Sequence, residues 1–208
     1  MENIRNAIKG LQKSKIQSTI QSRLREFSEI REKEIDEIFI ELCFCIMTAN
    51  CGAEKCIEVH EQIQEDFLTI SQKELAKTFK RLGYRFPNIR SEYVVEARKK
   101  KAELEEQLND SQSEKNLRKW IVNNVKGLGW KESSHFLRNI GFKNLAIIDR
   151  HIIDILVSNN LVEEYKTITR KRYLEMEEIL ENLGKELDLN LAELDLYLWY
   201  LETGKILK

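Results

Sequence analysis

The sequence predicts an all-α protein. One proline and eight glycines in 208 residues leave few points at which helices must break. Apolar residues recur at three- and four-residue spacing along most of the chain, which is the period of a helix with one buried face. No segment alternates apolar and polar residues between turn signals, so we expect no sheet.

Apolar stripes and helix-start signals place the main elements in order. Residues 16–27 carry one stripe, and residues 35–46 carry a second that is broad enough for a central buried helix. Residues 71–74 and 111–114 fit the capping-box pattern, and residues 190–193 fit it more weakly, so a helix is expected to start at each. Counted this way, the chain holds about ten or eleven helices.

Three stretches interrupt the helical pattern. Gly83 suits the end of one helix, and Pro87 suits the first turn of the next. Residues 127–129 break a helix that ends near Val125, and residues 141–148 are expected to form a loop rich in apolar side chains.

Charge and hydropathy limit the class of protein. Lys and Arg number 34 against 35 Asp and Glu, so a nucleic-acid surface would have to be a local basic patch. No apolar run reaches the roughly 20 residues of a membrane span. The first residues are charged and lack the apolar centre of a signal peptide. We expect a cytoplasmic protein that does not contact membrane and whose thiols are reduced.

The segment Gly127-Leu128-Gly129 predicts a sharp turn between two helices. Glycines adopt positive φ and let another part of the chain come close, while Leu128 can plug into the core. The helix that follows presents unpaired N–H groups and the positive end of its dipole, which together suit a phosphate. The triplet alone also fits an ordinary tight turn.

The flanks of the triplet favour a DNA-binding turn. Small residues after it allow two helices to pack closely, and apolar residues on either side close one face. These flanking residues are Val125, Ser133, Ser134, Phe136, Leu137 and Ile140. Together they resemble a helix-hairpin-helix motif over about residues 117–141.

Lys131 and Asp149 are the candidate catalytic residues. Lys131 lies in the first turn after the hairpin, where the positive helix end disfavours its charged form and makes the neutral amine available to attack a sugar carbon. On position alone, a phosphate contact explains Lys131 equally well. Asp149 ends a buried apolar run and is expected to cap a helix while pointing at the lysine. His151 fits a structural or phosphate-contacting role.

These residues resemble a known group of enzymes. The lysine after the hairpin and the Asp149-Arg150-His151 sequence match the helix-hairpin-helix DNA glycosylase superfamily, which includes endonuclease III. More closely, the chain resembles the second family of 8-oxoguanine DNA glycosylases/lyases of archaea and some bacteria. The matching stretches are residues 41–50, 82–98, 126–141, 146–152 and 193–208.

The resemblance implies a two-lobed helical fold with the active-site cleft between the lobes. Residues 1–35 and 144–208 would form one lobe, and residues 36–143 would form the other. It also implies that Lys131 is the nucleophile and Asp149 the activating carboxylate of a glycosylase that nicks the strand by β-elimination. The partner would be double-stranded DNA that contains 8-oxoguanine, bound by a monomer that needs no metal or other cofactor.

The resemblance extends to the residues that contact DNA and the damaged base. Gly127, Gly129, Asn50, Arg85 and His151 would contact DNA. Guanine has an acceptor at N7 and 8-oxoguanine has a donor there, so a discriminating pocket needs an acceptor of its own. The C-terminus, with Lys208, would dock in the base pocket and supply that acceptor or a charge. Trp199, or less favourably Phe86, would stack on the flipped base, although Trp199 fits a core position equally well.

Other interpretations remain open at this point. A non-catalytic DNA-binding module needs no special lysine, and a helical interaction scaffold needs no DNA at all. A glycosylase for another damaged base, such as an oxidised pyrimidine, shares the same motif. The four cysteines, Cys43, Cys45, Cys51 and Cys56, are expected to be buried and inert. Cys56 and His60 have the spacing of a ligand pair but lack two further zinc ligands nearby.

Overall fold

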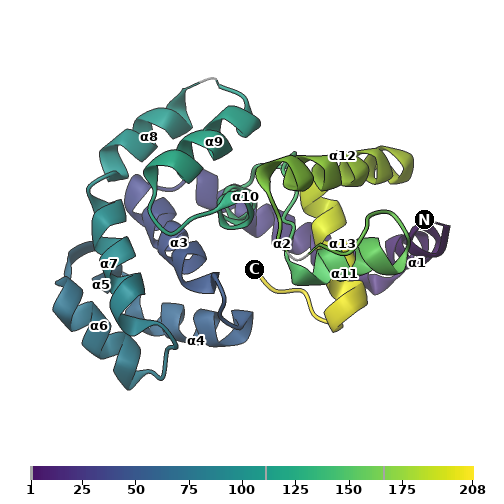
Figure 1. The fold of residues 1–208 in the computed structure, drawn as a ribbon. Helices are drawn as coiled ribbons and strands as arrows, with labels where there is room; N and C mark the ends of the chain where they lie inside the picture. The colour runs from purple at the N-terminus through teal and green to yellow at the C-terminus, as the bar shows by residue number, and fades with distance from the viewer. Residues whose placement is uncertain (1, 111, 166) are drawn as a thin grey trace. The chain divides into compact units, whose positions relative to one another are not determined.

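The computed structural model describes residues 2–110, 112–165 and 167–208. These residues form thirteen helices and no strand, as the sequence predicts, although two or three short helices go beyond the expected count (Figure 1). The helices are α1 Glu2–Gln12, α2 Lys15–Arg31, α3 Ile35–Thr48, α4 Ala53–Ile63, α5 Asp66–Thr69, α6 Gln72–Arg81, α7 Pro87–Arg98, α8 Lys101–Asn109, α9 Glu114–Asn124, α10 Trp130–Asn139, α11 Arg150–Ser158, α12 Arg170–Leu187 and α13 Leu191–Thr203. None of the helices in these residues is long and apolar enough to cross a membrane.

Two of the three predicted capping boxes are confirmed. Ser71 begins α6 and Asn190 begins α13, each by the reciprocal bonds of a capping box. The third prediction is wrong in position. Helix α9 is capped by Ser113, whose hydroxyl accepts from the N–H of Asn116 at 3.3 Å, and Ser111 lies outside the described residues.

The chain divides into two compact units. Unit 1 contains residues 1–29 and 137–208, and unit 2 contains residues 30–136. Helices α2 and α10 each cross a boundary, so the divisions fall inside helices, a few residues before the positions 35 and 143 proposed from sequence.

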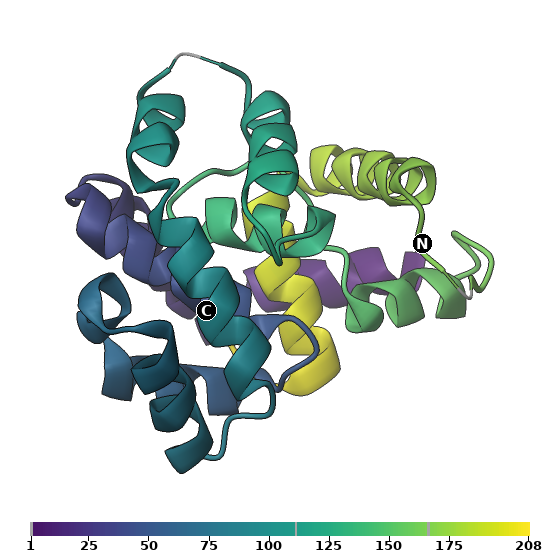
Figure 2. The same cartoon turned by 60° about the vertical axis from the view of Figure 1, so that its left-hand side comes forward.

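Unit 2 is built around α3. All but one of its residues from Ile38 onward are buried, because neighbours cover it on several sides: α4, α5, α7 and α8 all pack on it. The central buried helix predicted over residues 35–46 is therefore confirmed. Helices α8 and α9 of the same unit lie side by side in Figures 1 and 2.

Unit 1 packs helices from both ends of the sequence. Helix α13 contacts α1, α11 and α12, and its residues from Leu194 to Leu198 are all buried. Ile8 of α1 and Ile20 of α2 are fully buried in the same unit. The apolar loop predicted at 141–148 is present, and residues 145–148 are buried.

Candidate active site

The predicted site residues fall in both units. Unit 2 contains Asn50, Arg85, Phe86, Gly127, Gly129 and Lys131, whereas unit 1 contains Asp149, His151, Trp199 and Lys208. Each set is described within its own unit.

The hairpin turn depends on one of its two glycines. Gly127 has a φ of +91°, and a Cβ atom placed there would lie 2.2 Å from the ring of Tyr93. A side chain at Gly129 would meet only the flexible Glu132 carboxylate, at 3.3 Å, and its φ is not in the positive region. Leu128 between them is buried, so it anchors the turn as predicted.

Lys131 occupies the first turn of α10. The helix begins at Trp130, and the N–H of Ser133 bonds to the carbonyl of Gly129 at 3.0 Å. The backbone N–H groups of residues 130–132 therefore point out of the start of the helix, where they can donate hydrogen bonds to a phosphate oxygen. The Lys131 side chain is half-buried at this end.

A buried arginine joins the two hairpin helices, and sequence reasoning missed it. Arg118 on α9 is fully buried, its Nη1 donates to Ser134 Oγ at 3.1 Å, and its guanidinium lies 4.8 Å from the centre of the Trp130 ring. Ser133 and Ser134 are also fully buried, which fits the expected close approach of the helices. The sequence offered little reason to place Arg118 in the core, because arginine is seldom fully buried.

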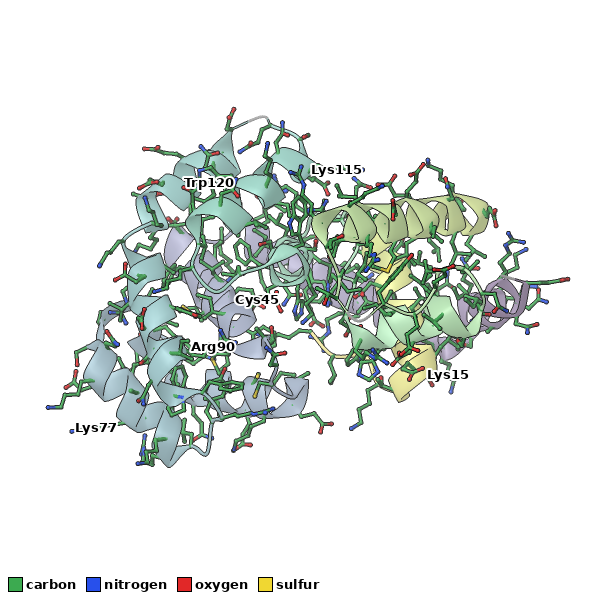
Figure 3. The ribbon with its side chains drawn as sticks, viewed as in Figure 1. Lys15, Cys45, Lys77, Arg90, Lys115 and Trp120 are labelled. Atoms are coloured by element: carbon green, nitrogen blue, oxygen red, sulfur yellow. The ribbon has the colours of Figure 1, made fainter. Side chains whose placement is uncertain are left out.

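The loop after α3 is held by side chains from the start of α7 and the turn before it. Asn50 is exposed and has a φ of +60°. Its carbonyl accepts from Arg85 Nη1 at 3.3 Å, and the carbonyl of Ala49 accepts from Arg90 Nη2 at 2.8 Å. Arg90 is labelled on α7 in Figure 3. These bonds fix the backbone that presents the Asn50 side chain.

Arg90 and Tyr93 connect this loop to the hairpin. The Arg90 guanidinium lies 5.7 Å from the Phe86 ring centre and 5.4 Å from that of Tyr93, and Tyr93 covers Gly127. Asn50, Phe86 and the hairpin are therefore linked within unit 2. Neither Arg90 nor Tyr93 was predicted, although their three-residue spacing after Pro87 placed both on one helix face.

In unit 1, Asp149 is the N-cap of α11, as predicted. Its Oδ1 accepts from the N–H of Ile152 at 3.0 Å, and its backbone is extended. One carboxylate oxygen thus caps the helix, which leaves Oδ2 for a second role. The neighbouring Arg150 pairs with Asp154 at 3.0 Å and with Glu164 at 3.7 Å, so it is a salt-bridge residue.

Two side chains of α12 hold the segment that leads to Asp149. Tyr173 donates its hydroxyl to the carbonyl of Ala146 at 2.7 Å and accepts from the N–H of Ile148 at 3.3 Å. The carboxylate of Glu177 accepts from the N–H of Ala146 at 3.0 Å. Both residues are buried, so backbone groups that the irregular segment could not pair for itself are satisfied.

His151 and Trp199 also meet in unit 1. Their ring centres are 4.9 Å apart with planes at 83°, and His151 Nδ1 lies 3.7 Å from the carboxylate of Glu202. Trp199 is half-buried, and its indole N–H is buried without a hydrogen-bond partner among the described residues. Beyond it, Gly204 ends α13 in a left-handed conformation, and the last residue, Lys208, is half-buried.

The cysteines differ from expectation at one position. Cys43, Cys45 and Cys56 are buried, as predicted, but Cys51 is partly exposed because it lies in the loop before α4. His60 is a core residue: its Nε2 lies 2.9 Å from the carbonyl of Ile40 and its ring packs against Phe44 and Phe67. Among the described residues, no group of three or more side chains suits a metal ion.

Comparison with known proteins gives matches over the whole chain. A family model described as 8-oxoguanine DNA glycosylase matches residues 20–189. A protein of Korarchaeum cryptofilum named 8-oxoguanine DNA glycosylase/AP lyase is 46% identical, over 100% of this chain and 99% of its own. A protein of the same name from Methanocaldococcus jannaschii is 47% identical, with 97% of each chain covered.

A solved structure agrees with these matches. The 8-oxoguanine glycosylase/lyase of Methanocaldococcus jannaschii, crystallised in complex with a 15mer DNA containing 8-oxoguanine, superposes with a TM-score of 0.96. The identity is 46%, and both chains are covered completely. The helical fold of this chain is therefore similar to one that has been solved with damaged DNA bound.

Proposed function

This chain belongs to the 8-oxoguanine DNA glycosylase family, and from that premise we propose that it excises 8-oxoguanine from duplex DNA and then cleaves the strand at the abasic site. The observation that carries the proposal is the match, complete on both chains, to a relative crystallised with 8-oxoguanine DNA. The hairpin and the capped Asp149 supply the chemistry that such a reaction needs.

Lys131 is the proposed nucleophile. In support, Lys131 is half-buried in the first turn of α10, the same turn whose outward-pointing backbone amides suit the phosphates of the strand. The amine attacks C1′ as the N-glycosidic bond breaks, and the base leaves with the bonding electrons and takes up a proton. The nitrogen then loses its protons, the C1′–O4′ bond breaks and O4′ takes up a proton, which opens the sugar ring and leaves a C1′ imine. Protonation of this imine makes a C2′ proton acidic, and β-elimination expels the 3′ phosphate.

Asp149 is the proposed charge partner of this reaction. Its N-cap bond fixes the carboxylate orientation, and the negative charge stabilises the positive character that develops on the sugar. Tyr173 and Glu177 are positioning residues, because they hold the Ala146–Ile148 backbone from which Asp149 projects.

The hairpin and the loop at Asn50 form the proposed DNA-contacting surface of unit 2. The hairpin amides suit phosphate, and Asn50 and Arg85 offer exposed donors on a backbone that Arg90 fixes. His151 is the corresponding candidate in unit 1. Since each phosphate neutralised releases counterions, log affinity for DNA should fall by a few units per unit of log salt concentration.

Trp199 and Lys208 are the proposed base-recognition residues, with Phe86 as an alternative stacking partner. The buried indole N–H of Trp199 lacks a partner in the described part of the chain, which fits a group that a ligand completes. Extending the chain with a short polar tail after Lys208 tests this role. Loss of 8-oxoguanine excision with retained cutting at a preformed abasic site supports it, and full excision contradicts it.

A panel of single-lesion duplexes with borohydride tests the function as a whole. We expect a protein–DNA adduct and strand cleavage with 8-oxoguanine, little with oxidised pyrimidines or undamaged DNA, and no loss of activity with chelator. Binding without trapping on any lesion would favour a DNA-binding module, and preferential trapping on an oxidised pyrimidine would favour the other glycosylase. The monomeric state remains a prediction.

A further inference from the structure

Cys51 and Cys56 stand on either side of the start of α4. Gly52 is the N-cap, so Cys51 is the residue before the cap and Cys56 is the fourth residue of the helix. Side chains at these two positions meet across the first turn in many helices, where apolar pairs act as a staple. Here the Cys51 thiol is close enough to Cys56 to raise the pKa of its thiol.

The two thiols have unequal access to solvent. Cys51 is partly exposed, whereas Cys56 is fully buried beneath it and lies 3.5 Å from the carbonyl of Met47. Burial, together with the Cys51 thiol, raises the pKa of Cys56, so Cys56 remains a protonated thiol. The other two cysteines, Cys43 and Cys45, are fully buried on α3; Cys45 is labelled in Figure 3. An oxidant from solvent therefore reaches the pair first at Cys51.

The pair lies in a functional neighbourhood. The positive charges of Lys131 and Arg90 are close enough to act on Cys56. The Met47 carbonyl that accepts from Cys56 also accepts from the Tyr84 hydroxyl at 2.6 Å. Asn50 follows Met47 by three residues. Covalent change at the thiols would thus occur next to Asn50 in the chain and within electrostatic reach of Lys131.

We propose that Cys51 and Cys56 form a peroxide-sensitive dithiol that closes to a reversible disulfide across the first turn of α4. The site is a modification site separate from the glycosylase chemistry, and it does not depend on the proposed function. Transient disulfides of this kind are the form in which cysteine pairs are oxidised in reducing compartments.

The chemistry needs only a hydroperoxide as oxidant. The Cys51 thiol first loses its proton, and the thiolate attacks one peroxide oxygen. The O–O bond breaks, and the departing hydroxide takes up that proton to leave as water, which gives a sulfenic acid on Cys51. The Cys56 sulfur then attacks the Cys51 sulfur, the S–O bond breaks, and the departing hydroxyl takes the Cys56 proton to leave as water. Two thiols and one hydrogen peroxide thus give one disulfide and two waters.

Peptide mapping tests the proposal directly. Trypsin cleaves after Lys55, between the two cysteines, so a disulfide joins the peptide 34–55 to the peptide 56–73. The full chain is treated with hydrogen peroxide, alkylated and digested without reductant. We expect this linked pair to be the dominant oxidised product, to involve Cys51 rather than Cys43 or Cys45, and to disappear on adding dithiothreitol.

Variants separate the two thiols. Cys51→Ser should abolish the link, Cys56→Ser should leave a sulfenic acid at Cys51 that dimedone traps, and Cys45→Ala is the matched control that should retain the link. Oxidised wild-type protein should also exchange amide hydrogens of the first turn of α4 more slowly than reduced protein, and Cys51→Ser should show no such difference. The idea fails if wild-type Cys51 proceeds to sulfinic acid without a link, or if peroxide links Cys56 to another cysteine.

Discussion

The hairpin of unit 2 and the Asp149 segment of unit 1 are held in place by different kinds of interaction. The hairpin is fixed by close packing, since the ring of Tyr93 fills the space where a side chain of residue 127 would be. The Asp149 segment is fixed by its backbone hydrogen bonds: Glu177 accepts one, and Tyr173 accepts one and donates one. We infer that the proposed nucleophile, Lys131, is placed by shape and its proposed carboxylate partner, Asp149, by polar contacts. Substitutions should therefore act differently in the two regions.

The largest effect is expected from removing the amine of Lys131, the proposed nucleophile. Lys131→Gln should abolish borohydride trapping and lower the single-turnover rate on the order of 10³-fold or more, because no other amine replaces it. Lys126→Gln is the matched control on the same hairpin: Lys126 is exposed and paired with Glu92 at 2.5 Å. If the Lys131 variant is trapped at the wild-type rate, the amine of Lys131 is not the nucleophile.

Removal of charge from Asp149 ranks next. Asp149→Asn keeps an N-cap acceptor for Ile152 and loses only the charge, so the single-turnover rate should fall about 10²-fold. The affinity for lesion DNA should stay within about tenfold, roughly 1.4 kcal/mol. Single-turnover kinetics and DNA titration check these two quantities, and thermal unfolding of the same preparation checks that the variant is folded. An unchanged rate would reduce Asp149 to a structural cap.

Gly127→Ala tests the claim that shape fixes the hairpin. The substitution combines a positive φ with a collision against Tyr93, so we expect a loss of about 2 kcal/mol or more in the free energy of unfolding, and weaker DNA binding. Gly129→Ala should cost much less, because only the flexible Glu132 carboxylate is near. Adding Tyr93→Ala to Gly127→Ala should relieve the collision and leave the backbone strain. Equal losses at both glycines would contradict the packing account.

Tyr173→Phe should have the smallest effect and should sharpen the contrast most. It removes a donor to Ala146 and an acceptor for Ile148, so stability should fall by about 1–2 kcal/mol. The cleavage rate at saturating DNA should drop several-fold while affinity for DNA is retained, since the change acts through the orientation of Asp149. Tyr165→Phe, at a ring that packs under Arg172, is the control. A variant that loses affinity and keeps its rate would show that the tyrosine does not act through Asp149.

Sequence patterns predicted the helical class, the hairpin and the Asp149 cap because each depends on neighbours close in the chain. A positive-φ glycine, a buried leucine and a capping carboxylate are all local signals. Tyr173, Glu177 and Arg118 were missed because their partners lie distant in sequence, Ala146 being 27 residues from Tyr173. Nothing in the spacing of α12 distinguishes a tyrosine that binds backbone from one that merely fills the core.

Cys51 illustrates a different limit. Its neighbours in sequence suggested another buried thiol, yet the loop that contains it turns through a left-handed residue at Asn50 and leaves Cys51 partly exposed. Backbone conformation at one residue thus decided the exposure of the next.

The discontinuous make-up of unit 1 has a consequence for synthesis of the protein. Unit 2 is a single continuous stretch, so it can complete its fold while later residues are still being added. Helix α1 must wait for α12 and α13, which are made later, and the intervening 30–136 segment must close as a loop before they meet. We expect nascent or truncated chains to expose the apolar faces of α1 and α2, and to be the species that chaperones and proteases recognise.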